Sequence, residues 1–168
     1  FAAHPYDVIH RLAERTGAEA YVLPVPAFAN TVEDRTVLLG QRGIGEAFDL
    51  AKAANLLFVG IGTTDREASL VASGMIEREE IEEIKQDGGV GELLGHFFDI
   101  CGEPVETTLS DRTLALGRDD LKDRRIVAVA GGKVKMRAMR AVLESRFLKG
   151  LITDERTARS LVEEMPAG

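Results

Sequence analysis

The chain has 168 residues, the length of one domain and enough to bury a hydrophobic core. Its 21 lysines and arginines against 28 aspartates and glutamates give a formal net charge of −7, which argues against a domain that grips a nucleic-acid backbone. A single cysteine, Cys101, excludes an internal disulfide and favours a reducing cytoplasm. No apolar run approaches the roughly 18 residues of a membrane span, so no membrane contact is expected.

The first part of the chain predicts three helices and two strands. Apolar residues at helical spacing, ended by a glycine, predict a helix over 5–17, and AEAYVLPV predicts a strand over 18–25. Short helices are expected over 31–39 and 46–55. The run LLFVGIG, residues 56–62, is uniformly apolar and closed by glycines, the pattern of a strand buried on both faces.

The middle of the chain predicts a surface helix and a hairpin. The acidic segment 77–89 has the composition of an exposed helix that ends at its Asp-Gly-Gly. Residues 95–109 predict two strands around a turn at Cys101, residues 112–116 a strand, and residues 118–123 a short helix.

The last part alternates strand and helix. A strand is expected from residue 126, a helix over 133–145, the strand GLITD over 150–154, and a closing helix over 154–164. Such alternation predicts a parallel sheet with helices on both faces. We therefore expect one α/β domain over residues 1–168, a three-layer Rossmann-like parallel sheet with a small antiparallel hairpin insertion.

Parallel sheets bind ligands at the carboxyl ends of their strands. Of the loops expected there, the most distinctive is Gly131-Gly132-Lys133-Val134-Lys135. It matches neither a P-loop nor a dinucleotide fingerprint, because the spacing is wrong and no third glycine follows. Two interpretations stay open: an anion cradle at a helix N-terminus, or a tight turn with solvated lysines.

Other polar residues are equally ambiguous from the residues alone. Glu92 could receive sugar hydroxyls or point to solvent from a helix, and the second is preferred. Asp111 and Arg112 form a pair that would have little energetic consequence if exposed. The histidines and Cys101 lack metal-ligand spacing, and no nucleophile elbow is present, so no metal, cofactor or catalytic residue is predicted.

Four blocks of the chain nevertheless resemble one known family. They are IHRLAERTGAEAYVLPVPAF, VGIGTTDREASLVASGMI, GGVGELLGHFFDICGEPVETTLSDRTLAL and DLKDRRIVAVAGGKVKMRAMRAVLESRFLKGLITDERTARSLV. In this order they resemble the effector-binding domain of SorC-family, DeoR-like bacterial transcriptional regulators, over nearly the whole chain.

The resemblance implies a sensor. Such domains bind a sugar, sugar phosphate or polyol, help to build dimers or tetramers, and follow a helix-turn-helix domain that binds DNA. Their fold is similar to that of ribose-phosphate isomerases and glucosamine-phosphate deaminases. An enzyme of that kind is the alternative, although the isomerases' Asp-Gly-Ala-Asp and Lys-Gly-Gly-Gly runs are missing here.

The resemblance also implies which residues meet the ligand. Lys135 matches the family's lysine after the Ala-Gly-Gly turn, Glu92 its acidic residue before the G-x-F-F strand, and Asp7 a position where asparagine is common. The full set of expected ligand-binding residues is Gly60, Gly62, Glu92, Asp111, Arg112, Gly131, Gly132 and Lys135. The family's Gly-Gly-Thr-Thr or Gly-Gly-Ser phosphate loop has no counterpart, so the first strand-loop unit and the helix-turn-helix domain are expected upstream.

Overall fold

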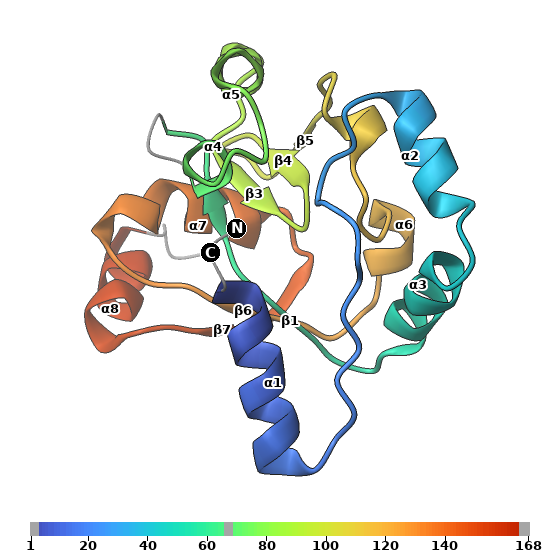
Figure 1. Cartoon of the computed structure of the whole chain (residues 1–168). Helices are drawn as coiled ribbons and strands as arrows, with labels where there is room; N and C mark the ends of the chain where they lie inside the picture. Colours follow the sequence, from blue (N-terminus) through green and yellow to red (C-terminus); the bar gives the residue numbers. More distant parts are fainter. Residues whose placement is uncertain (1–3, 66–68, 165–168) are drawn as a thin grey trace.

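The computed structural model describes residues 4–65 and 69–164, and Figure 1 shows their arrangement. Helices α1 (His4–Thr16), α2 (Val32–Leu39) and α3 (Ile44–Ala53) form the first part of the chain, as the sequence predicts. Thr31 begins α2 as its N-cap, because its hydroxyl accepts a 3.0 Å hydrogen bond from the Asp34 amide.

The strand expected over residues 18–25 is not observed. These residues lie between α1 and α2 without regular structure, although their composition favours a strand. A strand needs a partner for its backbone groups, and among the described residues no strand pairs with this segment. The first pairing comes later, where Phe28 forms an isolated antiparallel bridge with Thr113. The strand predicted over 112–116 is likewise not observed: of these residues, Thr113 alone forms a β-bridge.

The parallel sheet consists of β1 (Leu57–Val59), β6 (Ile126–Val129) and β7 (Leu148–Ile152), in the order β1-β6-β7. On one face Ile126 and Ala128 are fully buried, and α7 (Met136–Glu144) packs there. Helix α8 (Glu155–Glu164) follows β7. The predicted strand–helix–strand–helix order of the C-terminal part is confirmed.

The opposite face of this sheet departs from the prediction. Phe58 is 60% exposed, Val129 52% and Ile152 52%. The expectation that β1 is buried on both faces is therefore wrong for the described residues, and helices cover the parallel sheet on one side.

A four-stranded antiparallel sheet lies against the other side of α7. Its strands are β2 (Gly62–Thr63), β3 (Gly91–Leu93), β4 (His96–Phe98) and β5 (Pro104–Val105). The predicted hairpin is its β4–β5 part, so the insertion is larger than expected. Helix α5 (Arg78–Gln86) covers it, with Ile81, Ile84 and Phe97 buried between them. Strand β3 approaches α7 so closely that a Cβ on Gly91 would lie 2.7 Å from the Ala138 carbonyl oxygen.

Short elements complete the chain: α4 (Ser69–Ala72), α6 (Arg118–Leu121), and the 3₁₀ turns η1 (Ser110–Arg112) and η2 (Lys133–Lys135). Within the described residues, no helix is long and apolar enough to cross a membrane.

Candidate functional site

Glu92 lies at the centre of β3, opposite Gly62 on β2 and Phe97 on β4. The preferred interpretation, a carboxylate facing solvent from a helix, is therefore wrong. Its Oε1 accepts a 2.6 Å hydrogen bond from the Gly95 amide, in the turn that follows. A Cβ on Gly62 would collide with Glu92 Oε2. Gly62 is therefore the residue that leaves room for this carboxylate.

Lys135 reaches the same place from η2. Its Nζ donates a 2.8 Å hydrogen bond to the carbonyl oxygen of Ile61, the residue before Gly62. Burial raises the pKa of Glu92, while the Gly95 amide and the positive charge of Lys135 oppose that rise. Glu92 from β3 and Lys135 from η2 thus both lie next to the backbone of Ile61 and Gly62.

A cavity of about 570 Å³ opens beside Glu92. That volume is within the usual range for small-molecule sites. Among the described residues, Glu92 is the one charged residue in its lining, which is otherwise mostly apolar and includes Leu23, Phe48, Leu57, Leu94 and Leu116. This apolar lining has no signal in the sequence, because residues from α3, β1 and the 114–116 segment meet only in the fold.

The Gly131-Gly132 turn is in contact with residues at the start of α8. The Gly132 amide donates to Thr157 Oγ1 at 3.0 Å, and the Thr157 amide donates to Asp154 Oδ1 at 2.9 Å. A Cβ on Gly131 would lie 2.6 Å from Asp154 Oδ2. Of the two interpretations of this loop, the geometry supports the tight turn, docked on the start of α8, while Lys135 extends from it to the Ile61 carbonyl.

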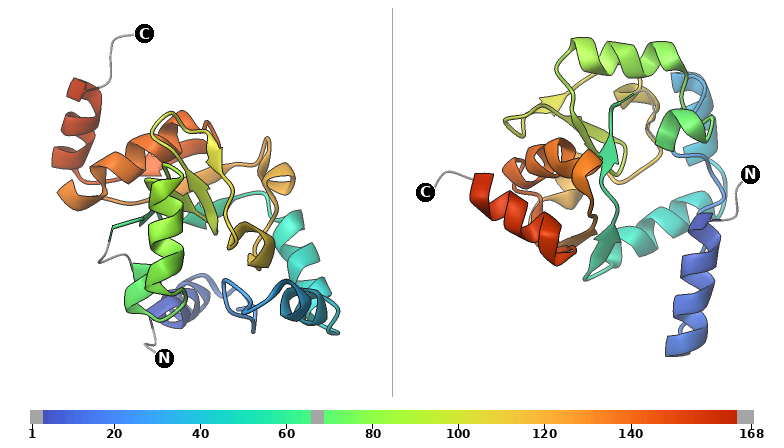
Figure 2. Two further views of the ribbon diagram at one scale, coloured as in Figure 1. Left: turned by 90° about the horizontal axis from the view of Figure 1, so that it is seen from above. Right: turned by 90° about the vertical axis from the view of Figure 1, so that its left-hand side faces the viewer.

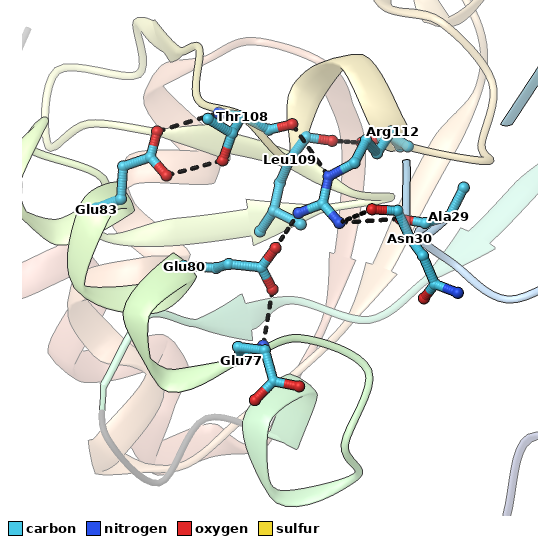
Figure 3. A network of polar contacts seen from close by, with 9 residues as sticks. Ala29, Asn30, Glu77, Glu80, Glu83, Thr108, Leu109 and Arg112 are labelled. Atoms are coloured by element: carbon cyan, nitrogen blue, oxygen red, sulfur yellow. Dashed lines mark hydrogen bonds and ion pairs between the residues drawn. The ribbon is translucent and has the colours of Figure 1, made fainter. Parts of the chain in front are cut away.

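Arg112 is used within the protein (Figure 3). Its guanidinium donates to the carbonyl oxygens of Ala29 and Asn30 at 3.0 and 2.9 Å and forms an ion pair with Glu80 of α5. The interpretation of an exposed pair of little consequence is therefore wrong for Arg112, which ties three segments together, and its expected contact with a ligand stays a prediction. Asp111 is exposed, as is Gly60, which has open space around it.

The remaining polar candidates have structural roles. His96 Nε2 lies 2.8 Å from the Leu116 carbonyl oxygen, and burial lowers the pKa of its ring, so the neutral imidazole donates there. The Asp7 side chain lies outside the described part of the structure. Over the described ranges, no group of histidine, cysteine, aspartate or glutamate side chains could hold a metal ion.

The geometry can be compared with known proteins. A family model described as "Putative sugar-binding domain" matches residues 1–163. The chain belongs to this sugar-binding domain family. It is 59% identical over 162 residues to the erythritol catabolism regulatory protein EryD of Brucella abortus, covering 96% of this chain and 51% of that protein. It is 33% identical to the transcriptional regulator LsrR of Klebsiella pneumoniae, covering 84% of this chain and 45% of LsrR.

Solved structures agree with this assignment. The sugar-binding domain of a transcriptional repressor from Vibrio fischeri superposes with a TM-score of 0.82 at 27% identity, covering 94% of this chain and 63% of that one. A SorC-family regulator from Enterococcus faecalis gives 0.71 at 30% identity, over 90% of this chain and 59% of that one. The resemblance to SorC-type regulators and the α/β fold class are confirmed, and these relatives are regulators rather than enzymes. The chain spans about half the length of the curated relatives it matches.

Proposed function

We propose that this domain senses a small polyol or sugar, free or phosphorylated, for a DNA-binding transcriptional regulator. The observation that carries the proposal is that Glu92 lines a largely apolar cavity, with Lys135 near enough for its positive charge to act on the carboxylate. A carboxylate accepts hydrogen bonds from ligand hydroxyls, and an ammonium donates to hydroxyl or phosphate oxygens. The apolar walls exclude water, which strengthens both contacts.

The effector class follows from the relative with 59% identity, which is named for erythritol catabolism. Erythritol is a four-carbon polyol. Its hydroxyls would donate to the Glu92 carboxylate while its carbon chain lies against the apolar lining. We therefore place a short polyol, or the same polyol carrying a phosphate, first among the ligands.

DNA binding is left to another part of the regulator. The net charge of −7 suits a domain that leaves DNA binding to another part of the protein. Ligand binding shifts DNA affinity only if the ligand prefers one state of the assembly, which we expect to be a dimer or tetramer in the cytoplasm. The helix-turn-helix domain and the first strand-loop unit belong to that longer protein.

A thermal-shift panel tests the proposal. Erythritol, erythritol 4-phosphate, ribitol, glucose and ribose 5-phosphate would each be added to the protein at increasing concentration. A sensor is stabilised in proportion to the logarithm of ligand concentration above the Kd, and leaves the ligand unchanged by mass spectrometry. Turnover of a stabilising compound would contradict the proposal, as would stabilisation that Glu92→Gln leaves at the wild-type level.

A further inference from the structure

One wall of the cavity beside Glu92 is made by two segments that are far apart in the sequence. Residues 27–30 and 112–116 meet at an isolated antiparallel bridge. The Ala29 amide donates to the Arg112 carbonyl oxygen at 2.8 Å. The Leu114 amide donates to the Ala27 carbonyl oxygen, also at 2.8 Å. The two segments contribute four residues to the lining, which we call the cavity wall: Ala27, Leu114, Ala115 and Leu116.

The backbone pairing of the cavity wall is too short to be stable by itself. An isolated pair of short strands is marginally stable in water, and within the described ranges these segments belong to neither sheet. The Arg112 side chain adds to the pairing, because its Nη1 donates to the carbonyl oxygens of Ala29 and Asn30 at 3.0 and 2.9 Å. Arg112 therefore ties residues 27–30 to residues 112–116 right beside the cavity wall.

The same guanidinium is fastened to helix α5. Its Nη2 forms the ion pair with Glu80 Oε1, and Glu80 Oε2 accepts a 2.7 Å hydrogen bond from the Glu77 amide (Figure 3). Helix α5 lies over the antiparallel sheet (Figure 2) and is held there by Ile81 and Ile84, which are buried. Glu80 is thus a carboxylate on a well-packed helix, and it connects Arg112 to one of the two hydrophobic cores.

Arg112 has little hydrogen-bonding capacity left for a ligand. Its guanidinium carries five N–H donors, and four of them have partners in the protein: the carbonyl oxygens of Thr108, Ala29 and Asn30, and the carboxylate of Glu80. The Arg112 side chain is only 17% exposed, and Arg112 is not one of the residues that line the cavity. Its influence on the cavity must therefore pass through the segments that it holds.

We propose that Arg112, together with Glu80, is a positioning residue for the effector site, which holds the cavity wall in place and so sets effector affinity without touching the effector. This inference rests on the proposed function, since the wall matters for affinity only if the cavity receives the effector. The closed wall keeps water away from the hydrogen bonds that Glu92 accepts, which strengthens them. A loosened wall admits water, and it weakens the binding of a free polyol and of its phosphate ester alike.

Amide hydrogen exchange tests the positioning role without any ligand. Arg112→Lys keeps the positive charge but loses the planar fork that reaches three partners at once. Glu80→Gln removes the negative charge and keeps a side chain that suits the capping box of α5. In both variants we expect the Ala29 and Leu114 amides to exchange at least about tenfold faster, relative to the amides of β6. The β6 amides are the reference because a lower global stability would speed their exchange as well.

Glu83→Gln is the matched control. Glu83 also lies on α5, but its carboxylate accepts from the amide and hydroxyl of Thr108, at 3.2 and 2.8 Å, and not from Arg112. In this variant, the exchange of the Ala29 and Leu114 amides should stay within about twofold of the wild-type rate. Wild-type exchange in Arg112→Lys and Glu80→Gln would overturn the proposal. Equal acceleration in Glu83→Gln would overturn it too, because any weakening of α5 would then have the same effect.

Calorimetric titration with erythritol and with erythritol 4-phosphate tests the consequence for binding. We expect Arg112→Lys and Glu80→Gln to weaken the binding of each compound that the wild type binds by roughly 3- to 30-fold, and by the same factor for both, while Glu83→Gln binds like the wild type.

Two results of the titration would overturn the proposal. A loss confined to the phosphate ester would show that Arg112 contacts the phosphate directly. Unchanged affinity in both variants would show that the cavity wall does not serve the site. If the wild type binds neither compound, the proposed function fails for these ligands, and the exchange rates still decide whether Arg112 and Glu80 hold the wall.

Discussion

The exchange Gly62→Ala tests whether the position of Glu92 is what makes the site. The added Cβ would collide with Glu92 Oε2 and lie 3.1 Å from Glu92 Cβ, so the carboxylate would have to leave its place. It would then lose the Gly95 amide, 2.6 Å from Oε1, and its alignment with the ligand. Hydrogen bonds to charged groups contribute about 1.5–3 kcal/mol, which corresponds to a loss of roughly 10- to 150-fold in affinity.

Calorimetric titration with erythritol measures that loss, and urea unfolding shows whether the fold is intact. We expect the free energy of unfolding to change by less than about 1 kcal/mol, since moving Glu92 outward also relieves its desolvation. Gly45→Ala is the matched control: it lies in α3 with open space around its would-be Cβ. Wild-type affinity in Gly62→Ala would refute the reasoning, because the ligand would then bind equally well with the Glu92 carboxylate displaced.

Three further predictions concern stability. Gly102→Ala should cost at least about 3 kcal/mol in urea unfolding, because Gly102 has a φ of 81° and its Cβ would collide with the Ser145 backbone amide; a loss under 1 kcal/mol would contradict this packing. Arg112→Leu should lower the free energy of unfolding by about 3–5 kcal/mol, since it leaves the mostly buried Glu80 without its ion pair. Adding Glu80→Leu should recover part of that loss. A double variant whose loss equals the sum of the two single losses would contradict the pairing. Burial lowers the pKa of His96 below its usual 6.5, so the contribution of the neutral ring to the stability of the fold is present above pH 6.5 and is lost as the pH falls through the lowered pKa. His96→Gln should flatten the decline of the free energy of unfolding below pH 6.5. An unchanged slope would show that other groups cause the decline.

The sequence was most informative where local patterns and tertiary pairing agree. The segment from β6 to α8 was predicted closely, because an apolar strand, a glycine turn and an amphipathic helix each have a strong signal. The segment over residues 18–25 was predicted as a strand from composition alone. Composition does not supply a pairing partner, and none lies beside it within the described chain.

The site shows a different limit. Lys135 and Glu92 were named through the family resemblance, and the structure brings both next to the backbone of residues 61 and 62. From the residues alone, Glu92 was placed on a helix, since the short β2–β3–β4 meander has few residues per strand and many glycines. The sequence suggested an exposed or ligand-binding Arg112 and not its internal contacts, because its partners Ala29 and Glu80 lie 83 and 32 residues away in the chain.

A double-mutant cycle on erythritol binding tests the central claim most directly. Kd would be measured by calorimetry for the wild type, Glu92→Gln, Lys135→Gln and the double variant, each of which keeps a hydrogen-bonding side chain of similar shape. If both groups hold one ligand in one site, each single variant loses affinity at least tenfold, and the two losses are non-additive by about 1 kcal/mol or more. Wild-type affinity in both single variants would contradict the account.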